Sequence, residues 1–208
     1  MDRRVNKRKI SKDRIKKERK PKNTILIALE GKNKTEKIYF NNFDDGKKPY
    51  SILFAKGSFT DPVNLVKILI SEINKIGLDL SYKDKAYCVF DTDTNKEKDK
   101  LIKEAKQLAK ENNIEIITST PSFELWFLMH YEYTTASFTN KSLLNRLQKH
   151  NKKYEKNYNI YCEINNKTNK AVERAKKLIN YQIENGKPVG TVDANPSTEV
   201  YKVVEDLL

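Results

Sequence analysis

The sequence predicts an α/β protein, with a mostly parallel sheet of four strands flanked by helices. Short apolar runs rich in β-branched residues alternate with longer stretches of helical periodicity between residues 24 and 131. Such alternation is typical of parallel strands joined by helical crossovers. The 208 residues, 38% of them apolar with eleven Tyr and eight Phe, suffice for one sizeable core.

Each element has its own sequence signal. Apolar runs predict the strands, at residues 24–29, 50–56, 85–91 and 114–119. Helices are expected between them, at residues 34–43, from Asp61 onward, at 95–113 and at 121–131. Asp61-Pro62 and Thr120-Pro121 each pair an N-cap residue with a proline suited to the first helical position.

The chain divides into three parts by composition. Residues 1–22 form a basic arm that we expect to be flexible, and residues 23–133 form the α/β core. Residues 134–208 are richer in Asn, Lys and Tyr, and their periodicity predicts a helical extension packed on the core, with helices near 141–150, 168–184 and 197–208.

The basic arm holds most of the positive charge. Its 12 Lys and Arg face 3 acids, so it contributes +9 to the chain's net charge of +13. Such an arm is either a solvated tail or a sequence-independent contact with nucleic-acid phosphates. The second alternative makes these residues candidates for binding nucleic acid: Arg3, Arg4, Lys7, Arg8 and Lys9.

Several function classes are disfavoured. No apolar run is long enough to span a membrane, and no signal-peptide core follows the N-terminus, so a cytoplasmic protein is expected. Cys88 and Cys162 have no metal-site or disulfide spacing. The segment EGKNKTEK, residues 30–37, is not a phosphate loop, which disfavours an ATPase.

Acidic residues follow two of the predicted strands. Glu30 ends the first strand, and Asp91 and Asp93 leave the third in the segment FDTDT, residues 90–94. Functional groups of open parallel sheets gather at the carboxyl ends of the strands. We therefore expect these three acids to converge. Glu36 is close enough in sequence to line the same cleft, and Glu124 opens the helix that follows the fourth strand.

Crowded carboxylates repel one another unless a cation neutralises them. Without His or Cys in the cluster, hard oxygen ligands favour Mg²⁺ or Mn²⁺ over zinc. A lone acid at a strand end is more often a turn former or a helix cap, so the joint placement of the acids carries the prediction. The sequence therefore predicts that a divalent cation binds where Glu30, Asp91 and Asp93 converge.

Four segments in order resemble one family. EGKNKTEKIYF, FDTDT, PSFELWFLMH and NPSTEVYKVVEDLL are similar to the RloB family of bacterial defence proteins, over Thr24 to Leu208. The glutamate after the first strand and the Asp-x-Asp after the third resemble the Toprim arrangement. One departure is that Asn33 and Lys34 lengthen the usual Glu-Gly-x-x-Thr-Glu spacing by one residue before Glu36.

This resemblance implies a Toprim-like fold and metal-dependent cleavage of phosphodiester bonds in RNA, such as tRNA, or in DNA. It also implies a role in anti-phage defence beside an ATPase partner. Glu30, Asp91 and Asp93 would then hold the metal, and Glu36 and Glu124 would support a second one. By position, Lys32 or Lys56 is a candidate for holding the phosphate.

A non-catalytic nucleic-acid-binding protein is the alternative. In that case the basic arm and tyrosines of the C-terminal half, Tyr154, Tyr158 and Tyr161, would grip nucleic acid by charge and stacking. Metal-dependent turnover distinguishes the two functions. Under the nuclease hypothesis, Glu30→Gln or Asp91→Asn should lower cleavage by orders of magnitude and leave the metal-free fold at least as stable.

Overall fold

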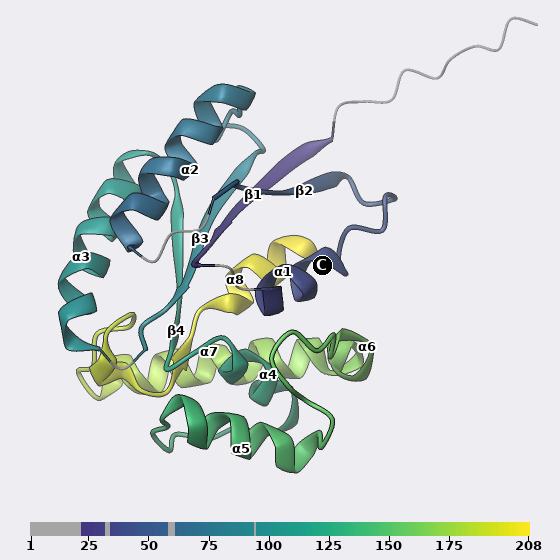
Figure 1. Ribbon diagram of the computed structural model, residues 1–208, viewed down its shortest axis with the longest axis vertical. Coiled ribbons are helices and arrows are strands. Elements are labelled where there is room, and N and C mark those ends of the chain that lie inside the picture. The colour runs from purple at the N-terminus through teal and green to yellow at the C-terminus, as the bar shows by residue number, and fades with distance from the viewer. Residues whose placement is uncertain (1–21, 32–33, 58–60, 94) are drawn as a thin grey trace, which may run out of the picture.

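The computed structural model describes residues 22–31, 34–57, 61–93 and 95–208, so the predicted arm lies outside the described residues except for Lys22. Five strands form one sheet in the order β2-β1-β3-β4-β5 (Figure 1). Four of them are parallel: β1 (Asn23–Leu29), β2 (Tyr50–Phe54), β3 (Lys85–Asp91) and β4 (Glu115–Thr120). The predicted α/β class is confirmed, and the arrangement is consistent with a Toprim-like fold.

The fifth strand was not predicted. β5 (Ser197–Thr198) pairs antiparallel with the end of β4, where Thr120 lies opposite Ser197. Two residues are too few to show the period-2 alternation that marks a strand in sequence. The helix predicted at residues 197–208 is shorter in the structure. It is α8 (Val200–Leu207), which begins after this strand.

One face of the sheet is covered by α2 (Pro62–Ile76) and α3 (Lys96–Glu111) (Figure 1). Alternate side chains of β1, Leu26 and Ala28, point into this layer and pack with Leu69 and Ile102. The expected N-cap of α2 is confirmed, since the Asp61 carboxylate accepts a hydrogen bond from the Asn64 backbone N–H at 2.8 Å.

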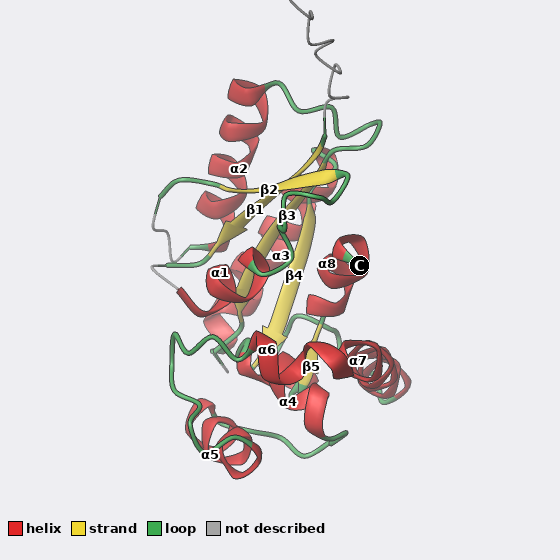
Figure 2. Cartoon of the chain, turned by 90° about the vertical axis from the view of Figure 1, so that its right-hand side faces the viewer, coloured by secondary structure: helices red, strands yellow, loops and turns green. Residues whose placement is uncertain are grey.

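The other face is covered mainly by helices, which are α1 (Lys34–Asn41), α4 (Glu124–Tyr131), α7 (Thr168–Glu184) and α8. Ile25 and Ile27 point into this layer, which also buries Trp126 completely. Figure 2 shows α2 and α8 on opposite sides of the sheet. Because both faces of β1 are buried, its sequence is a continuous apolar run.

Residues 134–208 share this second core. α7 packs on α4, and α8 packs on β4. Buried side chains from both parts of the chain, from Ile25 to Leu207, therefore belong to one core cluster. α5 (Asn140–His150) packs against α4 below the sheet in Figure 1. The remaining short elements are α6 (Tyr161–Ile164) and the 3₁₀ turns Asn165–Lys167 and Val192–Ala194.

The predicted start of α4 is wrong. Thr120 is the last residue of β4, and the helix begins at Glu124 without a side-chain cap. The pairing of Thr120 with Ser197 in β5 extends the strand by one residue, so Thr120 does not act as an N-cap. Pro121 and Ser122 lie between the strand and the helix, and the Thr120–Pro121 peptide is cis.

None of the helices in the described part of the chain is both long enough and apolar enough to cross a bilayer. The long helices instead bury one face and expose the other.

Candidate active site at the carboxyl edge of the sheet

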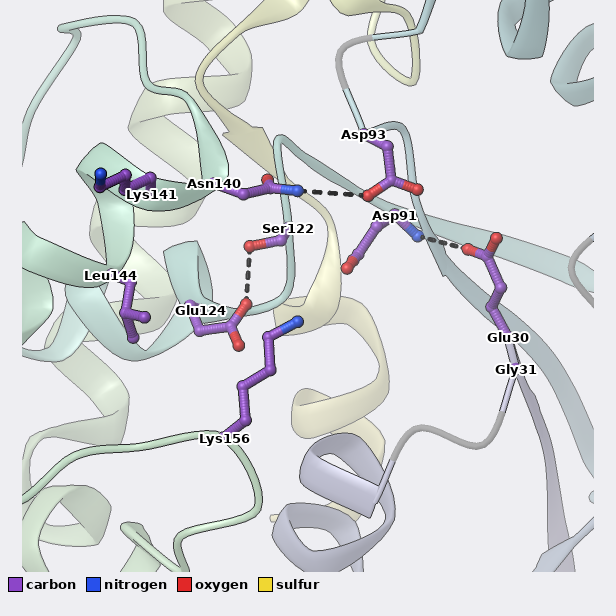
Figure 3. A pocket seen from close by; sticks show the side chains of 10 residues that line it. All are labelled: Glu30, Gly31, Asp91, Asp93, Ser122, Glu124, Asn140, Lys141, Leu144 and Lys156. Atoms are coloured by element: carbon purple, nitrogen blue, oxygen red, sulfur yellow. Dashed lines mark hydrogen bonds between the residues drawn. The ribbon is translucent and has the colours of Figure 1, made fainter.

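A cavity of about 420 Å³ lies where β1 and β3 end, closed on the opposite side by α5 (Figure 3). It therefore joins the α/β core to the C-terminal helices. Its lining residues are Glu30, Gly31, Asp91, Asp93, Ser122, Glu124, Asn140, Lys141, Leu144 and Lys156.

Glu30 reaches this cavity because β1 ends at Leu29 and the chain turns at once. Gly31 makes the turn with φ of +63°, a conformation that costs other residues a steric penalty. The Glu30 carboxylate accepts a hydrogen bond from the Asp91 backbone N–H at 3.2 Å. The predicted convergence of the first and third strands at one edge is thus present.

Asp91 and Asp93 both line the cavity, but a turn rather than strand alternation brings them there. Asp91 is the last residue of β3, and Asp93 has a left-handed φ of +54°. The Thr92 N–H donates to the Ser119 carbonyl at 3.0 Å, and the Asp93 N–H donates to the Pro121 carbonyl at 3.2 Å. These bonds fix the segment against the end of β4.

Glu124 lies on the floor of the cavity at the start of α4 and is 7% exposed. Two hydroxyl groups donate to its carboxylate, Ser122 Oγ at 2.6 Å and Tyr154 Oη at 3.4 Å. A buried carboxylate needs such donors. The sequence-based expectation that Glu124 has a polar partner is therefore confirmed.

Glu36 lies on α1 and is 6% exposed. Although it does not line the cavity itself, its negative charge shifts the pKa of two nearby groups, Asp91 and Tyr154. It raises the pKa of Asp91, and after burial and Glu124 it is the next cause that raises the pKa of Tyr154. Glu36 thus belongs to the same electrostatic cluster as Glu124 and Asp91.

The pKa of Asp91 is raised well above its usual range, first by burial and then by the carboxylates around it. In decreasing order of effect these are Glu36, Glu124, Asp93 and Glu30. All five acids singled out in the sequence are therefore close enough to interact. Each neighbouring negative charge makes the ionised form of Asp91 less stable.

Sequence reasoning missed a buried lysine in this cluster. Lys98, in the first turn of α3, is 8% exposed, and its ammonium donates to both carboxylate oxygens of Glu30, at 2.7 and 3.0 Å. It also donates to Asp93 Oδ2 at 3.0 Å. The available signal was its position five residues after Asp93, on the helix that leaves the same strand end.

The ion pair between Lys98 and Glu30 affects the pKa of both residues. Burial raises the pKa of Glu30, and Lys98 opposes that rise without cancelling it. Burial lowers the pKa of Lys98, but its bonds to Glu30 and Asp93 outweigh burial, so the net pKa is raised. Lys98 therefore remains an ammonium at neutral pH.

Of the predicted phosphate-binding residues, only Lys56 falls within the described part of the chain. Lys56 is exposed and is absent from the cavity wall, while Lys32 and the arm residues Arg3, Arg4, Lys7, Arg8 and Lys9 lie outside the described residues. The C-terminal half instead contributes Lys141 and Lys156. In Figure 3 Lys156 points toward the acids. No local signal marks Lys156, because it comes from a loop far from the acids in sequence.

Two of the three tyrosines considered for stacking are used inside the protein. Tyr154 is 1% exposed and lies under the cavity floor, so the expectation that it stacks on a base is wrong. Tyr161 is partly buried and packs edge-on against Phe43. The partly buried Tyr158 donates its hydroxyl proton to Glu163.

The donor set fits a hard divalent cation, since carboxylates are the only charged acceptors in the cluster. The described acids are nonetheless not arranged as ready ligands: among residues 22–31, 34–57, 61–93 and 95–208, no three His, Cys, Asp or Glu side chains are poised around one point. Lys98 lies between Glu30 and Asp93, so a cation binding to both would have to displace its ammonium.

The protein is of the α/β class, with an acid-lined cavity at the carboxyl edge of its sheet, and this arrangement is consistent with a Toprim-like fold. A model of the RloB-like protein family matches residues 25–207, and the chain belongs to this family. No curated protein sequence matches the chain significantly, and neither does any solved structure.

Proposed function

We propose that this protein is a nuclease that cleaves phosphodiester bonds in RNA or DNA with the help of Mg²⁺ or Mn²⁺. The observation that carries the proposal is the crowding of four carboxylates around Asp91, three of which line the same cavity as Asp91 and Lys156. Carboxylates crowded in this way repel one another, and a divalent cation relieves that repulsion.

Asp91, Glu30 and Asp93 would hold this cation, and Glu36 and Glu124 would support it or a second one. When bound, the cation supplies an activated water and stabilises the negative charge that develops on the phosphate. The hydroxyls of Ser122 and Tyr154 keep the Glu124 carboxylate oriented toward the cavity. Asn140 of α5 donates to Asp93 at 3.4 Å and links the two cavity walls.

Among the described residues, Lys156 is the best placed to hold the substrate phosphate. Its side chain is exposed at the cavity, and among the described residues no carboxylate lies within 4.0 Å of its ammonium to form an ion pair. A cation without an acidic partner is free to bind a phosphate oxygen. Lys141 lies at the rim of the same cavity and adds positive charge there.

Family membership extends the proposal to biology. By resemblance to defence-linked RloB proteins, the nuclease would act against phage infection together with an ATPase partner in the cytoplasm. Co-expression tests this step: the chain alone and the chain together with an ATPase encoded beside a member of the family are expected to differ in their effect on cell growth during infection.

The direct test incubates the purified chain with Mg²⁺ or Mn²⁺ and with labelled plasmid, single- and double-stranded oligonucleotides and bulk tRNA. Cleavage is expected with either cation and not with a chelator. Asp91→Asn should lower cleavage by orders of magnitude, whereas Asp193→Asn, at an exposed acid outside the cavity, should not. Binding without cleavage under every condition would instead favour the nucleic-acid-binding alternative.

A further inference from the structure

Lys98 is placed differently from Lys141 and Lys156, two lysines that line the cavity. Its ammonium makes three hydrogen bonds to Glu30 and Asp93, all between 2.7 and 3.0 Å. Its side chain is only 10% exposed, and it extends from the first turn of α3 toward the ends of β1 and β3. Lys98 therefore compensates the charge of two of the three acids predicted to bind metal.

We propose that Lys98 is a tethered cation that occupies the metal-binding carboxylates when no divalent cation is bound. A divalent cation that binds Glu30 and Asp93 displaces the ammonium, which then faces the substrate phosphate. Only this last step rests on the proposed nuclease function. The exchange itself concerns cation binding and is independent of cleavage.

The geometry supports exchange because the two cations would share the same acceptors. Lys98 bonds both oxygens of Glu30, so a metal ion cannot approach the pair without weakening those bonds. The two positive charges would also repel each other at a separation of a few ångströms. The flexible four-carbon stem of lysine allows the ammonium to move while the helix stays in place.

Removing the ammonium should therefore tighten cation binding. Replacing Lys98 by Met or Gln frees both carboxylates and removes the repulsion, so the dissociation constant for Mn²⁺ is expected to fall by about tenfold. The metal-free melting temperature should fall, because Glu30 loses its buried partner. If Lys98 merely oriented the carboxylates, the same changes would weaken Mn²⁺ binding.

The experiment measures Mn²⁺ and Mg²⁺ affinity by calorimetry for the wild type, Lys98→Met, Lys98→Gln and Lys98→Arg. Lys98→Arg keeps the charge and should bind about as weakly as the wild type. Lys100→Met is the matched control, since Lys100 is exposed on the same helix. Unchanged or weaker binding in both uncharged variants would overturn the proposal.

A measurement on the unaltered chain guards against misfolded variants. Acetylation of lysines by acetic anhydride, mapped by mass spectrometry, should modify Lys98 slowly without metal and faster when Mg²⁺ is saturating. Equal modification with and without Mg²⁺ overturns the exchange, as does the absence of any cation binding. Cation binding with the expected exchange but without cleavage would overturn the nuclease function alone.

Discussion

The acidic cluster has two halves, which differ in the groups that surround their carboxylates. In the lysine-paired half, Glu30 and Asp93 share the Lys98 ammonium. In the carboxylate-crowded half, Asp91 lies among acids that all raise its pKa, led by Glu36 and Glu124. Both halves lie at the carboxyl edge of one sheet, and both consist of acidic residues chosen by the same sequence pattern.

The difference shows that an acidic cluster is not electrostatically uniform. A single buried ammonium bonds to two carboxylates, whereas Asp91 lies among carboxylates that raise its pKa. The crowded half is where a divalent cation would relieve the most repulsion. Replacing a carboxylate by the corresponding amide should therefore have opposite effects on metal-free stability in the two halves.

The largest effect is expected for Asp91→Asn. Losing the central carboxylate should lower the cleavage rate by about 10²- to 10³-fold. Because the variant also removes repulsion, its metal-free melting temperature should rise by a few degrees. Cleavage assays and thermal melts without metal check the two parts, with Asp193→Asn as control. A lower metal-free melting temperature would show that the crowded half is compensated after all.

Glu30→Gln should also lose cleavage but respond oppositely in the melt. The neutral amide weakens the bonds to Lys98, which should cost about 2 kcal/mol of metal-free stability. The sequence-based expectation that both substitutions spare the metal-free fold is thereby revised for Glu30. Denaturant unfolding, with the exposed Glu184→Gln as control, measures the cost. A stabilised Glu30→Gln would remove the distinction between the halves.

Lys156→Ala should affect substrate binding more than folding. Because the side chain is exposed and forms no ion pair in the described structure, unfolding stability should change by less than about 0.5 kcal/mol. KM should rise about tenfold, and the salt dependence of binding should decrease. Lys152→Ala removes an exposed lysine outside the cavity and should leave KM unchanged. Equal effects of both variants would mean that only bulk charge matters.

His130 should leave both halves unaffected while responding to pH. Burial lowers its pKa to about 4, assisted by Arg174 and Lys167. Because the unfolded pKa is near 6.5, its contribution of about 3 kcal/mol is present above pH 6.5 and is lost as the pH falls toward 4. Melts of His130→Gln between pH 7.5 and 4.5 should show a weaker pH dependence than the wild type. A changed Mn²⁺ affinity would link His130 to the cavity.

The acids of the candidate site could be predicted from the sequence because their signals are local. Glu30 and Asp91 each end an apolar run, and parallel strands bring their carboxyl ends to one edge. The same locality explains the errors. Lys156 and Tyr154 come from a loop more than sixty residues after Asp91, and no periodicity indicates that this loop folds back on the acids.

By itself, the sequence determined the alternation of strands and helices, the family and the five acids, because burial on both faces of β1 and the strand ends leave marks along the chain. Only the tertiary structure decided which partners bond to Glu30, Asp93 and Glu124. Lys98 pairs with Glu30 across 68 residues, and Glu124 receives a proton donor from Tyr154, 30 residues away. Charge compensation depends on distances of a few ångströms in space, and a residue pattern does not encode such distances.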